Sequence, residues 1–145
     1  MNVSATFYQL DSDDLFEAVT PLVVECYRAR QPLVLICKDK ASAEAWDEHL
    51  WRQPNDAFIP HNLRGEGPAN GTPVTITWPP VSETKAVAIN LAGDVLPLQR
   101  PLKQVIDFVP TDDSGKQAAR ERYKQYQQAG CTMQFKQFSK EINNG

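Results

Sequence analysis

The sequence has 145 residues, of which 41% are hydrophobic, and it carries 18 acidic against 15 basic side chains. We expect one domain over residues 1–145, because a chain of this length can bury a core without disulfides or a metal. The net charge of −3 argues against a protein that binds DNA with its whole surface, since non-specific DNA binding depends on neutralised phosphates. The sequence has neither an apolar run of membrane-spanning length nor a signal peptide, so we expect a cytoplasmic protein without membrane contact. Three scattered cysteines, Cys26, Cys37 and Cys131, predict buried thiols rather than a disulfide framework or a zinc site.

The N-terminal third predicts two strands and two helices in alternation. ATFYQL (5–10) alternates as a strand does, and LVLIC (33–37) is apolar throughout, which is typical of a strand buried on both faces. Between them, apolar residues recur at helical spacing from Leu15 to Cys26, and Pro21 should kink or restart this helix. A second helix is predicted over 41–51. The candidate N-cap residues of the first helix are Asp11, Ser12 and Asp13.

The rest of the chain predicts three further strands and one helix. FIPHNLRGEGPANGTP (58–73) contains three prolines and three glycines and is expected to be mostly loop. The predicted strands are VTITW (74–78), VAINL (87–91) and QVIDFV (104–109). The last helix is predicted to begin with a capping box of Ser114 and Gln117 and to end before Gly130. The polar tail after about residue 131 is expected to be loose.

Candidate catalytic and metal-binding residues are few. The two histidines, His49 and His61, have no Cys or Asp at ligand spacing, and no nucleophile motif is present. Asp11 and Asp39 follow the first two strands, where doubly wound sheets place their sites, but acids in these positions also cap helices. GEGPANG (65–71) lacks the Lys and the Ser or Thr of a phosphate-binding loop, so it predicts a turn. We therefore expect no catalytic residue, no metal and no cofactor.

Apolar residues gather where the second helix ends and the proline-rich loop begins. They are Trp51, Phe58, Ile59 and Pro60. Two interpretations fit: an exposed anchor patch for a protein partner, or a segment that folds back onto the core.

The stretch KQAARERYKQY (116–126) carries four basic residues against one acidic residue in an otherwise acidic chain. On a helix, Lys116, Arg120, Tyr123 and Lys124 share one face. The neighbouring face, which is expected to touch the core, holds Ala119, Tyr123 and Tyr126. Such a surface suits an acidic peptide with an apolar end, because arginine can grip a carboxylate with two hydrogen bonds. The same pattern also fits a helix surface that is simply solvated.

Three groups of sequence segments resemble the chi subunit family of the bacterial DNA polymerase III holoenzyme. Members of this family are accessory proteins of the clamp loader. They are ATFYQLD (5–11), DEHLW with FIPHNLRGEGP (47–51 and 58–68), and DFVP with KQAARERYKQY (107–110 and 116–126). The resemblance implies an α/β protein with nucleotide-binding-like topology but no nucleotide site. We therefore predict a three-layer α/β/α domain with a largely parallel, mixed sheet. It also implies a non-enzymatic adaptor.

Two partners are implied by this resemblance. One is the psi subunit of the clamp loader, and the other is the acidic C-terminal tail of single-stranded DNA-binding protein (SSB), which ends in an aromatic residue and a free carboxylate. DNA would be reached only indirectly, through SSB. The residues implied for psi binding are Trp51, Phe58, Ile59 and Pro60. The residues implied for binding the SSB tail are Val109, Lys116, Arg120, Tyr123 and Lys124.

Two hypotheses of other classes remain open at this stage. A direct single-stranded DNA-binding module would use the basic helix over 116–126. A nucleotide-using enzyme would rest on the α/β pattern with Asp11 and Asp39.

Overall fold

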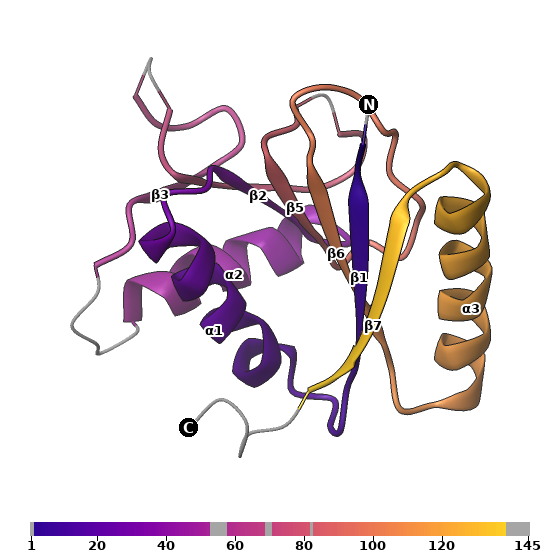
Figure 1. Cartoon of the computed structure of the whole chain (residues 1–145). Helices are drawn as coiled ribbons and strands as arrows, with labels where there is room; N and C mark the ends of the chain where they lie inside the picture. The colour runs from indigo at the N-terminus through magenta and orange to yellow at the C-terminus, as the bar shows by residue number, and fades with distance from the viewer. Residues whose placement is uncertain (1, 53–57, 69–70, 82, 139–145) are drawn as a thin grey trace.

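The computed structural model describes residues 2–52, 58–68, 71–81 and 83–138 (Figure 1). Its helices are α1 (Leu15–Arg28), α2 (Lys40–Arg52) and α3 (Asp113–Gln128). Its strands are β1 (Ser4–Gln9), β2 (Leu33–Ile36), β3 (His61–Leu63), β4 (Val74–Thr77), β5 (Val87–Asn90), β6 (Gln104–Val109) and β7 (Thr132–Gln137).

The strands form one sheet in the order β3-β4-β2-β5-β6-β1-β7, and all the pairs of neighbours are parallel. Helices α1 and α2 cover one face, and α3 covers the other at the β6-β1-β7 end (Figure 1). The predicted three-layer α/β class is confirmed, and the sheet is parallel throughout the described strands.

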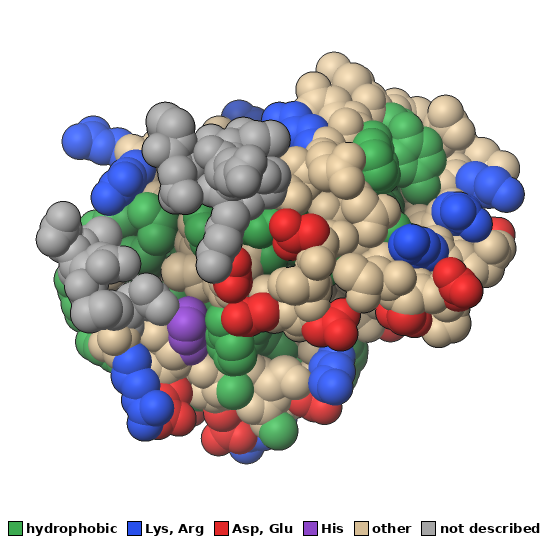
Figure 2. Space-filling view, turned by 90° about the horizontal axis from the view of Figure 1, so that it is seen from below, with side chains coloured by type: hydrophobic (Ala, Val, Ile, Leu, Met, Phe, Trp, Pro, Cys, Tyr) green, Lys and Arg blue, Asp and Glu red, His purple; other side chains and the backbone are tan. Residues whose placement is uncertain are grey.

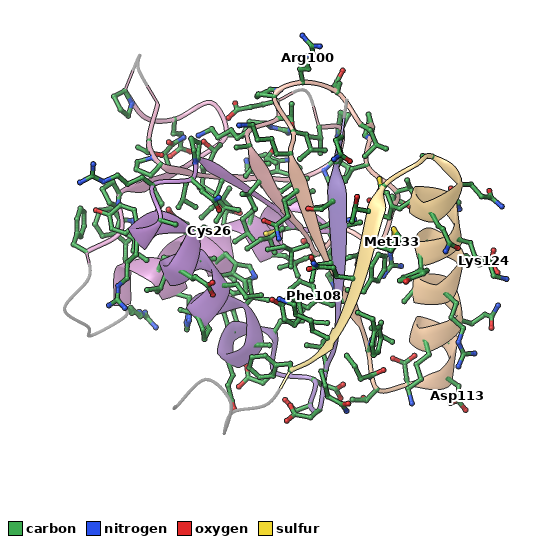
Figure 3. All side chains as sticks on the ribbon, viewed as in Figure 1. Cys26, Arg100, Phe108, Asp113, Lys124 and Met133 are labelled. Carbon is green, nitrogen blue, oxygen red and sulfur yellow. The ribbon has the colours of Figure 1, made fainter. Side chains whose placement is uncertain are left out.

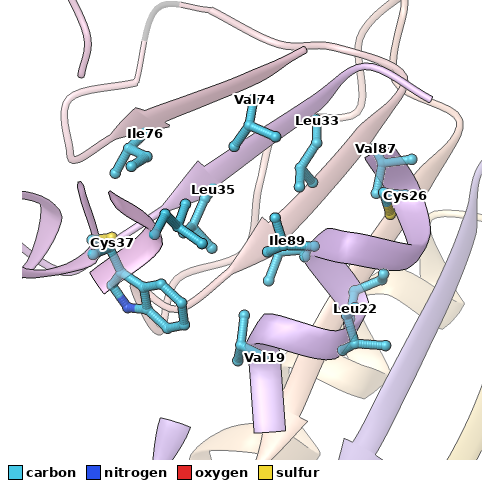
Figure 4. Packing of buried hydrophobic residues seen from close by; sticks show 14 of the residues in the cluster. Val19, Leu22, Cys26, Leu33, Leu35, Cys37, Val74, Ile76, Val87 and Ile89 are labelled. Carbon is cyan, nitrogen blue, oxygen red and sulfur yellow. The ribbon is translucent and has the colours of Figure 1, made fainter. Parts of the chain in front are cut away.

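The apolar run of β2 supplies both layers of the core. Leu33 and Leu35 pack with α1 and α2 in the cluster drawn in Figure 4. Val34 and Ile36 point to the opposite face and belong to the cluster that contains Tyr126 of α3. Because successive strand side chains alternate between faces, a strand covered on both sides must be apolar at every position.

Pro21 does not break the first helix. Helix α1 runs without interruption from Leu15 to Arg28, so the expected restart at Pro21 is wrong. A proline inside a helix costs about 3 kcal/mol, chiefly through a lost hydrogen bond and a steric clash. The buried side chains on both sides of Pro21, from Ala18 to Cys26, hold the two halves against the sheet and offset this cost.

The helix caps differ by a few residues from those predicted. Asp14, rather than one of the three preceding residues, caps α1 by accepting a hydrogen bond from the backbone N–H of Glu17. Asp112 caps α3, so the predicted Ser114 capping box is also wrong: Ser114 lies inside the helix and donates to Asp112. The predicted stop is confirmed, because Gly130 follows the C-cap with a φ of 93° that favours glycine.

Two strands lie at the edges of the sheet in segments expected to be irregular. Strand β3 falls within the proline-rich loop and pairs with β4. Strand β7 falls within the tail expected to be loose and pairs with β1 along its whole length. Residues 139–145, the rest of that tail, lie outside the described residues.

Candidate functional site

One of the four basic residues of 116–126 is not available to a ligand. Arg122 is buried and forms an ion pair with Asp107 of β6, with the Nε atom 2.9 Å from Oδ2. This contact turns Arg122 toward the sheet. The basic side chains that remain at the surface of α3 are Lys116, Arg120 and Lys124.

A pocket of about 380 Å³ lies between α3 and the strands β1, β6 and β7. It brings together four of the five side chains predicted for the SSB tail. These are Val109, Lys116, Arg120 and Tyr123. The remaining lining residues are Phe7, Gln9, Ala119 and Phe135.

The pocket combines an apolar interior with a basic rim. Phe7 is fully buried, and its ring meets the half-buried ring of Tyr123 edge-on, with 5.2 Å between centroids. Ala119 is buried and leaves room beside these rings. Arg120 is exposed and Lys116 is half-buried, so their charged ends can reach a ligand from the solvent side. Figure 2 shows basic side chains beside a hydrophobic patch at the α3 end of the molecule.

Lys124, the fifth predicted residue, does not line the pocket. Its ammonium nitrogen lies 4.0 Å from a carboxylate oxygen of Glu121 on the same helix. In Figure 3 its side chain extends from α3 away from the sheet. Lys124 therefore adds positive charge near the pocket but forms no part of its wall.

Four of the lining residues were not predicted as site residues: Phe7, Gln9, Ala119 and Phe135. Gln9 is the last residue of β1, and its amide nitrogen donates to the backbone carbonyls of Leu10, Val109 and Pro110 at 3.1–3.3 Å. Phe135 comes from β7, which lies in the tail expected to be loose. An isolated aromatic residue in the polar string TMQFKQ was the one indication in the sequence.

A second exposed apolar surface lies beside α2. Trp51 is 55% exposed and Phe58 is 63% exposed, and their ring centroids are 5.3 Å apart. Behind them, the buried ring of His61 lies 4.8 Å from that of Trp51. His61 is held by the backbone carbonyls of Ile59 and Asp47, at 2.7 and 3.2 Å. His61 thus supports the aromatic pair, which we call the Trp51–Phe58 surface.

The other two residues of this predicted set lie deeper. Ile59 is buried and belongs to the core between the sheet and the α1–α2 layer. Pro60 is half-buried. Within this segment, Trp51 and Phe58 therefore face solvent, while Ile59 folds back onto the core.

The two surfaces lie toward opposite edges of the sheet. Trp51 and Phe58 lie beside β3, the strand at one edge, and the pocket lies beside β7 at the other. Figure 1 shows α2 and α3 separated by the sheet.

Two of the other candidate residues, Asp39 and His49, have structural partners. Asp39 caps α2, because its carboxylate accepts a 2.8 Å hydrogen bond from the backbone N–H of Ser42, and this bond lowers the pKa of Asp39. His49 packs against the rings of Phe16 and Trp46, and burial lowers the pKa of its imidazole.

The described part of GEGPANG forms a turn and a bend, with positive φ at Gly65 and Gly67; residues 69–70 lie outside the described residues. Within the described ranges, no group of three or more His, Cys, Asp or Glu residues is placed to hold a metal ion. None of the helices in the same ranges is long and apolar enough to cross a membrane.

Comparisons with known proteins identify the family. Residues 3–134 match the family described as "DNA polymerase III chi subunit, HolC". The chain is 43% identical over 139 residues to the DNA polymerase III subunit chi of Escherichia coli (strain K12), covering 90% of this chain and 95% of that protein. It is 34% identical over 138 residues to the subunit of the same name from Haemophilus influenzae, covering 92% and 96%. A third protein of that name, from Pseudomonas aeruginosa, is 26% identical over 131 residues, covering 88% and 92%. The chain therefore belongs to the DNA polymerase III chi subunit family.

Proposed function

We propose that this protein is a non-enzymatic adaptor in DNA replication. One of its surfaces binds the psi subunit of the clamp loader, and the other binds the acidic C-terminal tail of SSB. The adaptor thereby links the clamp loader to DNA that is coated with SSB. The observation that carries this proposal is the pocket between α3 and β7, which has an apolar interior and a basic rim on an acidic protein.

The chemistry of the pocket matches a peptide that ends in an aromatic residue and a carboxylate. The rings of Phe7 and Tyr123 offer an apolar wall for the terminal side chain. Arg120, at the rim, can pair with the terminal carboxylate through two parallel hydrogen bonds. Lys116, one turn earlier on α3, supplies a less directional charge for acidic residues further along the peptide.

The Trp51–Phe58 surface is proposed to bind psi. Neighbouring exposed aromatic rings are typical of the residues that contribute most to protein–protein binding. Its place at the far edge of the sheet leaves the α3 pocket free, so that both partners can bind at once.

The test is fluorescence anisotropy with a labelled acidic peptide that ends in phenylalanine with a free carboxylate. It is compared with a single-stranded oligonucleotide of similar length. We expect the parent protein to bind the peptide and Arg120→Ala to lose most of this affinity. Arg100→Ala removes an exposed arginine that lies far from the pocket (Figure 3) and is the matched control, which should bind as the parent does.

Two results would contradict the proposal. The first is equal peptide binding by the parent and by Arg120→Ala. The second is tighter binding of the bare oligonucleotide than of the peptide, with loss in Arg120→Ala, which would favour a direct single-stranded DNA-binding module. A parallel titration with purified psi tests the second surface, and failure to bind there would remove the psi assignment alone.

A further inference from the structure

Phe135 is an exposed aromatic residue whose position is fixed by the edge strand β7. It pairs in register with Phe7 of β1, so both side chains lie on the α3 face of the sheet. Phe7 is fully buried beneath α3, whereas Phe135, one strand further out, is 57% exposed. The difference arises because β7 is the last strand of the sheet, beyond the full cover of the helix.

The ring of Phe135 lines the α3 pocket from the strand side, and that of Tyr123 lines it from the helix side. Phe7, which meets Tyr123 edge-on, is the register partner of Phe135 on the neighbouring strand β1. A ligand side chain that enters the pocket would therefore meet aromatic rings contributed by both β7 and α3.

The exposure of Phe135 indicates a role in binding. Exposed large hydrophobic side chains in the described residues are Trp51, Phe58 and Phe135. The first two form the surface beside α2, so Phe135 is the member of this set that belongs to the pocket. A ligand ring placed against it would cover apolar surface that is otherwise in water, and aromatic pairs add a favourable edge-to-face or offset contact.

We propose that Phe135 is a specificity-determining residue, which makes the pocket prefer a peptide with an aromatic terminal side chain over one with a small terminal side chain. This inference rests on the proposed function of the pocket as a peptide-binding site. The two residues have different roles. Arg120 pairs with the terminal carboxylate, which every peptide carries, whereas Phe135 contacts the terminal side chain, which differs between peptides.

The experiment uses two acidic peptides that are identical except for the last residue, which is Phe in one and Ala in the other. Both keep the free C-terminal carboxylate. Their affinities are measured for the parent protein and for Phe135→Ala. We expect the parent to prefer the peptide ending in Phe. Phe135→Ala should bind that peptide about tenfold more weakly, with a change of less than about twofold for the peptide ending in Ala.

A matched control lies on the same strand. Gln134→Ala alters the neighbouring residue, whose side chain is on the other face of the sheet and contacts Thr6, and both peptides should bind this variant as they bind the parent. Phe135→Leu keeps an apolar side chain of similar volume and should recover part of the lost affinity. Because Phe135 is exposed, thermal melting of Phe135→Ala should be close to that of the parent.

The outcomes distinguish this inference from the proposed function. If the parent binds the peptides and Arg120→Ala does not, but Phe135→Ala leaves both affinities unchanged or weakens both equally, the specificity role is wrong and the site stands. If the parent binds neither peptide, or if Arg120→Ala binds them as the parent does, the proposed function fails and the role of Phe135 fails with it.

Discussion

Arg122 of α3 and Asp107 of β6 form a buried ion pair with two hydrogen bonds, Nε to Oδ2 at 2.9 Å and Nη2 to Oδ1 at 3.0 Å. Arg122 also donates to the backbone carbonyls of Phe108 and Gly93, at 3.2 and 3.3 Å. These bonds tie α3 to the sheet and so fix the rotation of the helix about its own axis. That rotation directs Arg120 toward the rim of the pocket.

We predict that Arg122→Met destabilises the protein by roughly 3–5 kcal/mol, because it leaves the carboxylate of Asp107 buried without its charged partner. Urea denaturation monitored by circular dichroism measures this loss. The double variant Arg122→Met with Asp107→Asn should be less destabilised than the sum of its two single changes. A loss below about 1 kcal/mol for Arg122→Met would contradict a structural role for the pair.

The pH dependence of Arg122→Met follows from the same pair. Burial raises the pKa of Asp107, and the guanidinium of Arg122 opposes this rise. Without Arg122 the folded variant should hold a proton on Asp107 at a pH where the unfolded chain has lost it. Since the folded state then binds more protons, the stability of the variant, relative to the parent, should increase as the pH is lowered from about 7 to about 5. A difference in unfolding free energy between variant and parent that stays the same from pH 7 to pH 5 would contradict this prediction.

Arg120→Lys tests whether the pocket recognises a carboxylate by geometry or only by charge. We expect Arg120→Ala to weaken tail binding by roughly 2–5 kcal/mol and Arg120→Lys to recover little of it, because a lysine cannot form two parallel hydrogen bonds. Anisotropy with the free-acid peptide and with its C-terminal amide measures both effects. Equal binding of the amide, or parental affinity in Arg120→Lys, would show that charge alone is enough.

Lys116→Ala and Lys124→Ala should differ, although both remove one charge from the same helix. Lys116 lines the pocket, whereas Lys124 points away from it and lies near Glu121. We expect the larger loss of peptide affinity for Lys116→Ala. The loss for Lys124→Ala should be within about 1 kcal/mol and should disappear at high salt, because the field of an exposed charge is screened. Titrations at two salt concentrations measure this, and the reverse order would place the peptide on the outer side of α3.

Trp51→Ala and Phe58→Ala should each weaken psi binding and leave the fold intact. Loss of an aromatic side chain that is buried in the complex with psi costs roughly 1.5–3 kcal/mol of binding free energy. In the protein without psi both side chains are exposed, so folding should not depend on them. Calorimetry with purified psi measures the affinity, and circular dichroism checks the fold. Both variants should bind the acidic peptide as the parent does, because the two surfaces lie toward opposite edges of the sheet. A folded Trp51→Ala protein that lost both partners would contradict two independent surfaces.

Cys37→Ala should reduce the loss of stability at alkaline pH. Burial at the end of β2, with Asp39 nearby, raises the pKa of the Cys37 thiol to about 12. In the unfolded chain the thiol ionises at about pH 8.5–9, so the parent protein should lose stability as the pH rises above this value. The loss from this residue should be on the order of 3 kcal/mol near pH 11. Comparing urea denaturation of parent and variant at pH 8 and pH 10.5 measures the slope. An equal fall in unfolding free energy for parent and variant between these two pH values would contradict the prediction, whatever the variant's stability at pH 8.

The sequence by itself determined the elements whose side chains carry a strong pattern. LVLIC predicted a strand buried on both faces because each of its positions is apolar, and β2 is such a strand. Spacing along 116–126 placed Lys116, Arg120 and Tyr123 on one helical face, and these side chains line one pocket. Local periodicity is enough here, because a helix fixes the relative directions of residues three and four apart.

The tertiary structure alone decided which residues of the same type are buried and which face a ligand. Arg120 and Arg122 are two positions apart on one helix, yet the first is exposed and the second is buried, because Asp107 lies where Arg122 points. Phe135 lines the pocket because β7 pairs with β1. These two strands are far apart in the sequence, since Thr6 and Gln134, which are in contact, are 128 residues apart. Strand β7 carries polar residues at exposed positions, and β3 is only three residues long with a histidine at a buried position. Both strands therefore lack the hydrophobic pattern of a buried strand, and their partners are set by the sheet rather than by their own residues.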